Sequence, residues 1–273
     1  MSGVTEDREP TLAEAGYGPA DHDDAATARR WWDGEAEEYL AEHGDALGEV
    51  SFTWGPEGLT EAEAGALGDL TGARVLEVGA GSAPCGRWLA SRGVDVVATD
   101  LSHAMLRAGR AANERTGVDL PLVQADALHL PFTDGAFDVV FTSYGVLPFV
   151  ADAAAVHREA ARVLRPGGRW VFSTTHPVRW AFPDDPGPGG LTATRSYVDD
   201  TPYRELDETG AVIYAEYHRT LAQHVAQVTA AGFHVTTLLE PTWQPGRSTW
   251  GGWSELRSRH LPGTLVLGAQ LPA

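Results

Sequence analysis

A short apolar run followed by two closely spaced glycines constrains this chain more than any other feature. Residues 75–78 read Val-Leu-Glu-Val and show little alternation, as expected of a parallel strand that is buried on both faces. Gly79 and Gly81 then allow the backbone to bend sharply and to approach a ligand without a Cβ in the way. Asp100 ends the next apolar run, where its carboxylate can accept hydrogen bonds from a ribose diol. Together these residues predict a nucleotide site at one edge of a parallel sheet.

Two departures from the dinucleotide-binding pattern narrow the choice of ligand. A dinucleotide site needs a third glycine three residues after the second, and Pro84 stands there instead. Glu77 precedes the first glycine and would repel a pyrophosphate, whereas it suits a cation. S-adenosylmethionine carries a sulfonium and an amino group, which are cationic and suit Glu77. Its carboxylate could bind at the start of the helix that begins near Pro84, and its ribose could bind Asp100. The pattern therefore favours this cofactor; a purely structural turn with Glu77 at the surface is the alternative.

Composition excludes several classes of function. The 273 residues carry a formal net charge of −18, which argues against a general affinity for nucleic acid or an anionic membrane. There is no apolar run of the length that spans a bilayer, and the acidic N-terminus does not resemble a signal peptide. Cys85 is the single cysteine and lysine is absent, so an internal disulfide, a multi-cysteine zinc site and Schiff-base chemistry are impossible. We expect a cytoplasmic protein without a metal; its oligomeric state is not predicted.

The order of strand-like and helix-like segments predicts the architecture. Residues 1–25 are expected to be a mobile acidic tail, and residues 26–70 a helical cap. Residues 71–273 alternate strands with helices, which predicts an α/β domain with a doubly wound, mostly parallel, seven-stranded sheet. Residues 176–218 break this rhythm with prolines and glycines and are expected to form an inserted lid, with strand-like pieces at 193–198 and 211–217.

Such sheets bind ligands at the carboxyl ends of their strands. That rule alone nominates residues after five successive strands, namely Gly79, Ala80, Gly81, Ser82, Asp100, Leu101, Asp126, Ala127, Ser143, Tyr144 and His176.

Five motifs in order resemble the class I S-adenosylmethionine-dependent methyltransferases of the small-molecule type. They lie at residues 76–81 (LEVGAG), 100–102 (DLS), 124–127 (QADA), 137–140 (FDVV) and 163–168 (VLRPGG), so the resemblance is best over residues 70 to 175. The resemblance implies the Rossmann-like methyltransferase fold and S-adenosyl-L-methionine as cofactor.

The resemblance also implies roles for individual residues. Gly79, Ala80 and Gly81 would lie against the methionine part of the cofactor, and Glu77 would support that loop or the ammonium group. The adenosine part would be held by Asp100 at the ribose, Leu101 and Ala127 beside the adenine, and Asp126 at its amino group. Ser143 and Tyr144 would lie near the transferred methyl, and the segments that carry Tyr39 and Trp54 would close over the cofactor.

Six ionisable residues are candidates for chemistry at the acceptor, namely Tyr144, His176 and a cluster of Tyr214, Glu216, Tyr217 and His218. Tyr144 and His176 follow strand ends, although His176 could instead bond within its own loop. Alternation along a strand would put Glu216 and His218 on one face, where a carboxylate could orient an imidazole. An ion pair of Glu216 with Arg219 or Arg204 is the other reading. Several tryptophans and a phenylalanine could line an aromatic pocket or serve packing, namely Trp180, Phe182, Trp243, Trp250 and Trp253.

The resulting hypothesis is a methyltransferase that acts on a small aromatic or heteroaromatic metabolite. More loosely, the chain is similar to enzymes of natural-product tailoring, some of which methylate indole carbon. Residues 142–145 read Thr-Ser-Tyr-Gly and lack the Asn/Asp-Pro-Pro-aromatic motif of nucleobase amino methyltransferases. The alternatives are a non-catalytic, regulatory protein that binds S-adenosylmethionine, and a nicotinamide-dependent oxidoreductase, which Pro84 disfavours.

Overall fold

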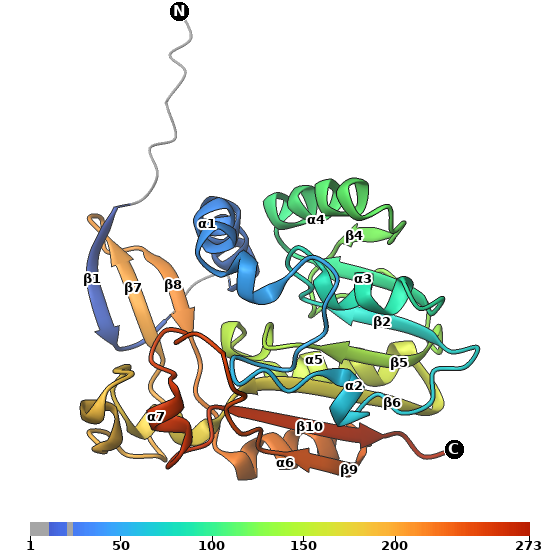
Figure 1. Cartoon of the computed structure of the whole chain (residues 1–273). Helices are drawn as coiled ribbons and strands as arrows, with labels where there is room; N and C mark the ends of the chain where they lie inside the picture. Colours follow the sequence, from blue (N-terminus) through green and yellow to red (C-terminus); the bar gives the residue numbers. More distant parts are fainter. Residues whose placement is uncertain (1–10, 21–23) are drawn as a thin grey trace, which may run out of the picture.

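A seven-stranded sheet forms the centre of the structure, a computed structural model that describes residues 11–20 and 24–273 (Figure 1). The strand order is β4-β3-β2-β5-β6-β10-β9, and only β10 runs antiparallel to its neighbours. The strands are β2 (Arg74–Val78), β3 (Asp95–Asp100), β4 (Leu122–Gln124), β5 (Phe137–Thr142), β6 (Leu164–Thr175), β9 (His234–Leu239) and β10 (Thr264–Gln270). The predicted doubly wound, mostly parallel sheet is confirmed.

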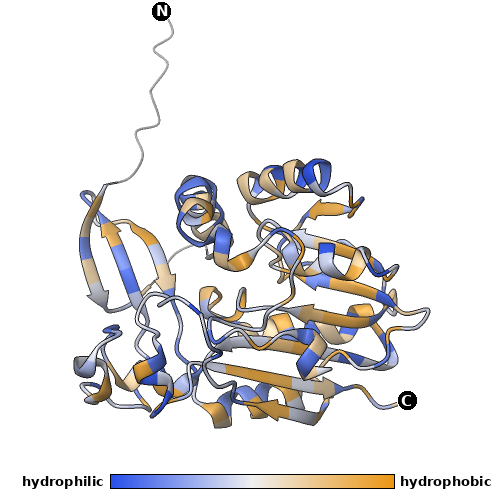
Figure 2. Cartoon of the chain, in the orientation of Figure 1, coloured by the Kyte–Doolittle hydropathy of each residue, from blue (hydrophilic) through white to orange (hydrophobic). Residues whose placement is uncertain are grey.

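Alternation along the strands sends side chains into two separate cores. Val75 packs on one face with Leu89 of α3, whereas its neighbour Leu76 packs on the other face with Val156 of α5. The helices that follow the strands are α3 (Pro84–Ala90), α4 (His103–Thr116), α5 (Ala153–Val163) and α6 (Leu221–Ala230). Figure 2 shows that hydrophobic residues predominate in the central strands. Because the chain turns from β4 back to β5 beside β2, a crevice is expected at the carboxyl ends of β2 and β5.

A second, three-stranded sheet contradicts part of the predicted mobile tail. β1 (Leu12–Tyr17) pairs antiparallel with β7 (Tyr203–Asp207), which pairs with β8 (Val212–Glu216). The prediction is therefore wrong for residues 12–17, while residues 1–10 and 21–23 lie outside the described residues. β1 buries little side-chain surface, so its strand state depends on backbone bonds to β7, about 190 residues away in the chain. Composition could not reveal that partner.

The segment predicted as a lid packs against the N-terminal helix. α1 (Asp24–Leu47) lies against β8, and Trp31 of α1 packs against Tyr214 with the rings tilted by 38° and their centroids 4.5 Å apart. Residues 211–217 contain β8 as predicted, whereas residues 193–198 hold no strand and β7 was not predicted. The remaining helical pieces are short, namely α2 (Glu61–Ala64), α7 (Glu255–Ser258), η1 (Leu147–Phe149), η2 (Pro177–Ala181) and η3 (Pro188–Leu191). Among the described residues, none of the helices combines the length and apolar character needed to cross a bilayer.

Candidate functional site

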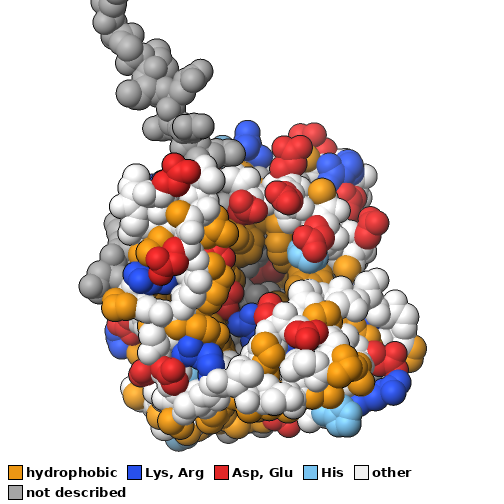
Figure 3. Space-filling model, turned by 90° about the vertical axis from the view of Figure 1, so that its left-hand side faces the viewer, with side chains coloured by type: hydrophobic (Ala, Val, Ile, Leu, Met, Phe, Trp, Pro, Cys, Tyr) orange, Lys and Arg blue, Asp and Glu red, His pale blue; other side chains and the backbone are white. Residues whose placement is uncertain are grey.

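A cavity of about 410 Å³ lies at the carboxyl ends of the parallel strands. Figure 3 shows this hollow, with hydrophobic side chains around a few acidic and basic ones. Its walls come from the loops after β2, β3, β4 and β5, from α1 and β8, and from residues 250–253. Its volume falls in the range of small-molecule sites.

The glycine turn after β2 forms the floor of the cavity. Gly79 and Gly81 have φ of +66° and +57°, which glycine adopts without steric cost. A Cβ at Gly79 would lie 2.3 Å from Val146 Cγ2, whereas a Cβ at Gly81 would meet no atom within 4 Å. Gly79 is thus required by close packing on the loop after β5, and Gly81 faces open space. The Ala80 N–H donates to the Thr99 carbonyl at 2.9 Å, which ties the turn to β3.

Glu77 is buried behind this turn, so the reading of Glu77 as a surface residue is wrong. Its Oε2 accepts a 2.8 Å hydrogen bond from the Gly86 N–H in the first turn of α3. That N–H at the start of α3 is therefore not available to a ligand carboxylate. Burial raises the pKa of Glu77 to about 8. Glu77 also borders the cavity, where a cationic ligand would favour its ionised form.

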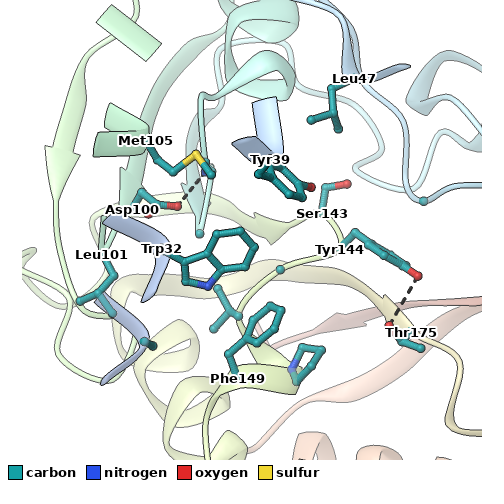
Figure 4. Close-up of a pocket in the computed structure, with 18 of the residues that line it drawn as sticks. Trp32, Tyr39, Leu47, Asp100, Leu101, Met105, Ser143, Tyr144, Phe149 and Thr175 are labelled. Carbon is teal, nitrogen blue, oxygen red and sulfur yellow. Dashed lines mark hydrogen bonds between the residues drawn. The ribbon is translucent and has the colours of Figure 1, made fainter. Parts of the chain in front are cut away.

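Asp100 connects the turn after β2 with the start of α4. Its Oδ2 accepts from the Gly81 N–H at 2.7 Å, and its Oδ1 accepts from the Ser102 N–H at 2.8 Å. Burial raises the pKa of Asp100 to about 6. Figure 4 shows Asp100 and Leu101 with Met105 at one end of the cavity.

The loop after β4 contributes Asp126 and Ala127 to the same cavity. Asp126 Oδ1 accepts a 2.9 Å hydrogen bond from the Leu128 N–H, which fixes the turn, and His129 Nδ1 lies 3.6 Å from the other oxygen. Two carboxylates, Asp100 and Asp126, therefore follow two neighbouring strands at one edge of the sheet.

Ser143 and Tyr144 follow β5 and also line the cavity. The Ser143 hydroxyl donates to the Thr53 carbonyl at 2.7 Å. Tyr144 has φ of +58°, unusual for a residue with a side chain, and its hydroxyl accepts from Thr175 at 3.5 Å. Tyr39 of α1 lies between the Asp100 end and the Tyr144 end (Figure 4). Burial raises the pKa of Tyr39 to about 12, so the phenol is neutral at physiological pH.

The structure corrects the assignment of Trp54. The side chain is fully buried in the core, and its indole N–H donates to Glu61 Oε2 at 2.8 Å. Its neighbours Thr53 and Gly55 line the cavity instead. The 53–55 segment therefore borders the site as predicted, but the indole points away from it because it completes the core beside Phe52 and is satisfied by Glu61.

The structure also places His176 outside the cavity. Its Nδ1 accepts from the Val178 N–H at 3.2 Å, and its Nε2 lies 3.0 Å from Glu240 Oε1. Burial lowers the pKa of His176, and the Glu240 carboxylate opposes that shift. The alternative of a histidine bonded within its own loop is the better description, since His176 caps the short helix η2. A proposal of His176 as a base at the acceptor is therefore withdrawn.

Glu216 and His218 do not form the predicted pair. Glu216 lines the cavity, where its carboxylate accepts from the Tyr214 hydroxyl and from Arg179 Nη1 at 3.2 Å. The His218 Nε2 instead contacts the Tyr197 carbonyl at 2.7 Å, outside the cavity. The prediction failed because β8 ends at Glu216, so its alternation does not reach His218. Within the described residues Glu216 pairs with Arg179, where Arg219 or Arg204 was the alternative.

One end of the cavity is mostly aromatic, and sequence reasoning found only part of it. Trp250 and Trp253 line the cavity as expected, whereas Trp180, Phe182 and Trp243 do not. The aromatic residues that were missed are Trp31, Trp32 and Phe149, and with them Arg179, whereas Tyr214 was expected as an ionisable candidate. Trp32 lies 5.4 Å from Tyr39 and 5.5 Å from Phe149 between ring centroids, so rings from α1 and η1 meet over the cavity (Figure 4). In the sequence these residues had no feature that separates them from core aromatics.

The residues at the Asp100 end fit S-adenosylmethionine. Acidic groups suit its ribose, adenine amino group and cationic centres, and the glycine turn leaves open space at Gly81. Within the described ranges, no cluster of three His, Cys, Asp or Glu side chains could hold a metal ion.

Comparison with known proteins gives a consistent picture. A family model described as a methyltransferase domain matches residues 76–172. A demethylmenaquinone methyltransferase of Mycobacterium sp. (strain KMS) is 35% identical over 212 residues, which cover 74% of this chain and 76% of that protein. Another of that name, from Beutenbergia cavernae, is 44% identical over 116 residues, which cover 42% of this chain and somewhat under half (46%) of that protein. A solved S-adenosylmethionine-dependent methyltransferase of Mesorhizobium loti has a TM-score of 0.61 at 27% identity, and the match covers 79% of this chain and all (100%) of that one.

Proposed function

The chain belongs to the S-adenosylmethionine-dependent methyltransferases, and from that premise we propose that it methylates a small molecule with an aromatic or heteroaromatic ring. The observation that carries this proposal is the aromatic part of the cavity wall, to which Trp31, Tyr214, Trp250 and Trp253 contribute. Aromatic walls favour a flat ring by burial and by stacking. The relatives named after demethylmenaquinone are compatible with a small-molecule acceptor.

The Asp100 end of the cavity is proposed to hold the cofactor, which supplies a methyl group already activated on a sulfonium. In this proposal the Asp100 carboxylate accepts hydrogen bonds from the ribose hydroxyls, and the Asp126 carboxylate faces the adenine amino group. Leu101 and Ala127, which line the cavity, flank the adenine. Gly79, Ala80 and Gly81 lie along the methionine part, with Glu77 behind them.

The protein then has to align the acceptor and to exclude water, because the leaving group needs no further activation. Ser143 and Tyr144 line the cavity and are proposed to border the methyl group, while Tyr39 covers it from α1. The acceptor atom in this proposal is a ring carbon, including that of indole, a nitrogen, or the oxygen of a hydroxyl group on the ring. The charge of −18 supports a small molecule over a nucleic acid as substrate.

Turnover with a methyl-labelled cofactor tests the proposal. Label should pass to aromatic small molecules and not to aliphatic amines or acids of similar size. Transfer to aliphatic compounds alone would contradict the aromatic assignment. Binding of the cofactor without transfer to any acceptor would favour the non-catalytic, regulatory alternative.

Titration calorimetry tests the cofactor end separately. Asp100→Ala should weaken S-adenosylmethionine binding by at least about tenfold, since bonds to a charged group are lost. Asp95→Ala, at the other end of the same strand and mostly exposed, is the matched control and should bind normally. Equal affinities of the two variants would refute the placement of the ribose.

A further inference from the structure

Arg179, Tyr214 and Glu216 form a connected polar group at the aromatic end of the cavity. Arg179 Nη1 donates to Glu216 Oε2 at 3.2 Å, and the Tyr214 hydroxyl donates to Glu216 Oε1. All three residues line the cavity, and the side chains of Arg179 and Glu216 are only 20% and 18% exposed. An ion pair is thus held at the surface where an acceptor would lie.

Arg179 retains hydrogen-bonding capacity that its surroundings do not use. Its guanidinium has five N–H donors, and in the described part of the chain its side chain donates one hydrogen bond, to Glu216. Asp184 Oδ2 lies 3.4 Å from Nη2 and is itself half exposed. Arg247 is the other arginine in the described cavity wall. Its guanidinium donates to the backbone carbonyls of Pro56 and Ala46 instead.

The position of Arg179 is fixed by the helix η2 that carries it. His176 caps this helix through its Nδ1, and the His176 N–H donates to the Gly263 carbonyl at 2.7 Å. Arg179 thus sits one 3₁₀ turn beyond the end of β6, close to Thr175, which donates to the Tyr144 hydroxyl in the cavity. A guanidinium held in this way is oriented before any ligand arrives.

The charges around Arg179 limit what it can bind. Glu216 and Asp184 already compensate the guanidinium, so a substrate carboxylate would meet two like charges. A protonated amine would face the guanidinium itself. A neutral hydroxyl satisfies both groups, because its oxygen accepts from Arg179 and its proton is offered to Glu216.

Building on the proposed function, we propose that Arg179 and Glu216 recognise an acidic hydroxyl on the aromatic ring of the acceptor. The hydroxyl proton moves to the Glu216 carboxylate. The electron pair that it leaves on the acceptor, on oxygen or on a conjugated ring carbon, forms the bond to the methyl carbon as the C–S bond breaks. The C–S electron pair stays on sulfur, which gives S-adenosylhomocysteine. Tyr214 is a positioning residue that holds Glu216.

Binding to the full chain saturated with S-adenosylhomocysteine tests the proposal with three matched probes. 1-Naphthol carries the hydroxyl, 1-methoxynaphthalene has the same ring without an acidic proton, and 1-naphthylamine replaces oxygen by nitrogen. 1-Naphthol should bind at least about tenfold more tightly than the other two, which corresponds to one hydrogen bond to a charged group.

Arg179→Met should abolish that preference, and Glu216→Gln should reduce it. Arg259→Met is the matched control, since Arg259 lies at the surface and pairs with Glu255, and it should keep the preference. Arg179→Lys provides a second variant that retains the charge but loses the fork, and it should lose most of the preference.

The two proposals can fail separately. Equal binding of the three probes, binding of none, or tighter binding of 1-naphthylamine would overturn the hydroxyl assignment, as would a preference that survives Arg179→Met. The affinity of each variant for S-adenosylhomocysteine shows whether its site is folded. Failure of the unmodified protein to bind S-adenosylhomocysteine would instead overturn the proposed function.

Discussion

The Asp33 carboxylate of α1 accepts a 2.7 Å hydrogen bond from the hydroxyl of Ser102 at the start of α4. The same Asp33 oxygen accepts from the Ala104 N–H at 2.9 Å, so α1 supplies a cap for α4. Ser102 also donates its backbone N–H to Asp100. Asp33 is thereby connected through one residue to the carboxylate proposed to hold the ribose, and α1 is fixed in place over the cavity.

Asp33→Ala should therefore affect both stability and cofactor binding. Loss of the shared cap should cost about 1 kcal/mol of unfolding free energy. The affinity for S-adenosylmethionine should fall several-fold, because α1 is no longer held beside Asp100. Denaturant unfolding and titration calorimetry measure the two effects. Asp33→Asn keeps an acceptor oxygen, so its stability and its affinity should lie between those of the unmodified protein and of Asp33→Ala. If Asp33→Ala binds the cofactor normally, the connection between Asp33 and Asp100 has no part in binding.

Gly79 offers a test of close packing that is separate from backbone strain. Gly79 and Gly72 have nearly the same positive φ, +66° and +68°, but only at Gly79 does an added Cβ meet another atom, at 2.3 Å. Gly72→Ala should therefore cost about 1 kcal/mol of stability from backbone strain and leave cofactor affinity unchanged. Gly79→Ala should also displace Val146 and weaken S-adenosylmethionine binding at least tenfold. If both variants bind the cofactor equally, the turn tolerates the clash and the assignment of Gly79 to close packing is wrong.

The part of the cavity wall at Gly79, Asp100 and Asp126 could be predicted from the sequence because the information for it is local. The run before Gly79, the two glycines and the strand-ending carboxylates of Asp100 and Asp126 each follow from a short stretch of chain and from the rule that ligands bind at strand ends. The aromatic end depends on packing between distant segments. Trp31 meets Tyr214 only because α1 lies on β8, and neither residue has a local signal of that contact.

Two errors have the same physical origin. His176 was expected in the cavity because it follows β6, but the chain turns at once into η2, so His176 becomes its cap and Arg179 reaches the cavity. His218 was expected beside Glu216 because strand alternation was assumed to continue two residues too far. In both cases the side-chain direction depends on where a strand ends, and strand ends are set by tertiary contacts rather than by local sequence.

A buried histidine should make the protein sensitive to acid. His157 Nδ1 accepts from the Trp170 indole N–H at 3.0 Å, and burial lowers the pKa of His157 to about 3. Since the folded-state pKa lies below the ordinary value of 6.5, the unfolded chain binds a proton that the folded chain does not. The stability contribution is complete above about pH 6.5 and is lost as the pH falls toward 3.

His157→Gln should flatten this dependence while it keeps an acceptor for Trp170. His157→Ala should cost about 1–3 kcal/mol even at pH 8, because the buried indole N–H loses its partner. Urea unfolding at pH 8 and pH 5 measures both effects, with the exposed His260→Gln as control. A glutamine variant that is as acid-sensitive as the unmodified protein would show that other groups cause the loss; His224, whose pKa burial also lowers to about 3, is the first to test.

Glu77 should have the opposite effect on the ligand-free protein. Burial raises the pKa of Glu77 to about 8, so between about pH 4.5 and 8 the folded chain keeps a proton that the unfolded chain has released. Stability from this group is therefore complete below about pH 4.5 and declines as the pH rises toward 8, by an amount on the order of a few kcal/mol. Glu77→Gln should remove that decline, while the exposed Glu114→Gln should not.

The same shift predicts that cofactor binding releases protons. A ligand with cationic groups beside Glu77 favours the ionised carboxylate. At pH 7 the Glu77 carboxyl should therefore be mostly protonated in the free protein and mostly ionised in the complex. Calorimetric titrations of S-adenosylmethionine in phosphate and in Tris, which differ in ionisation enthalpy, measure the number released. Glu77→Gln should abolish most of the buffer dependence, with a smaller part left from Asp100, whose pKa burial raises to about 6. Binding heats that are equal in the two buffers for the unmodified protein would mean that Glu77 stays protonated beneath the cofactor, and its role would then be limited to holding Gly86.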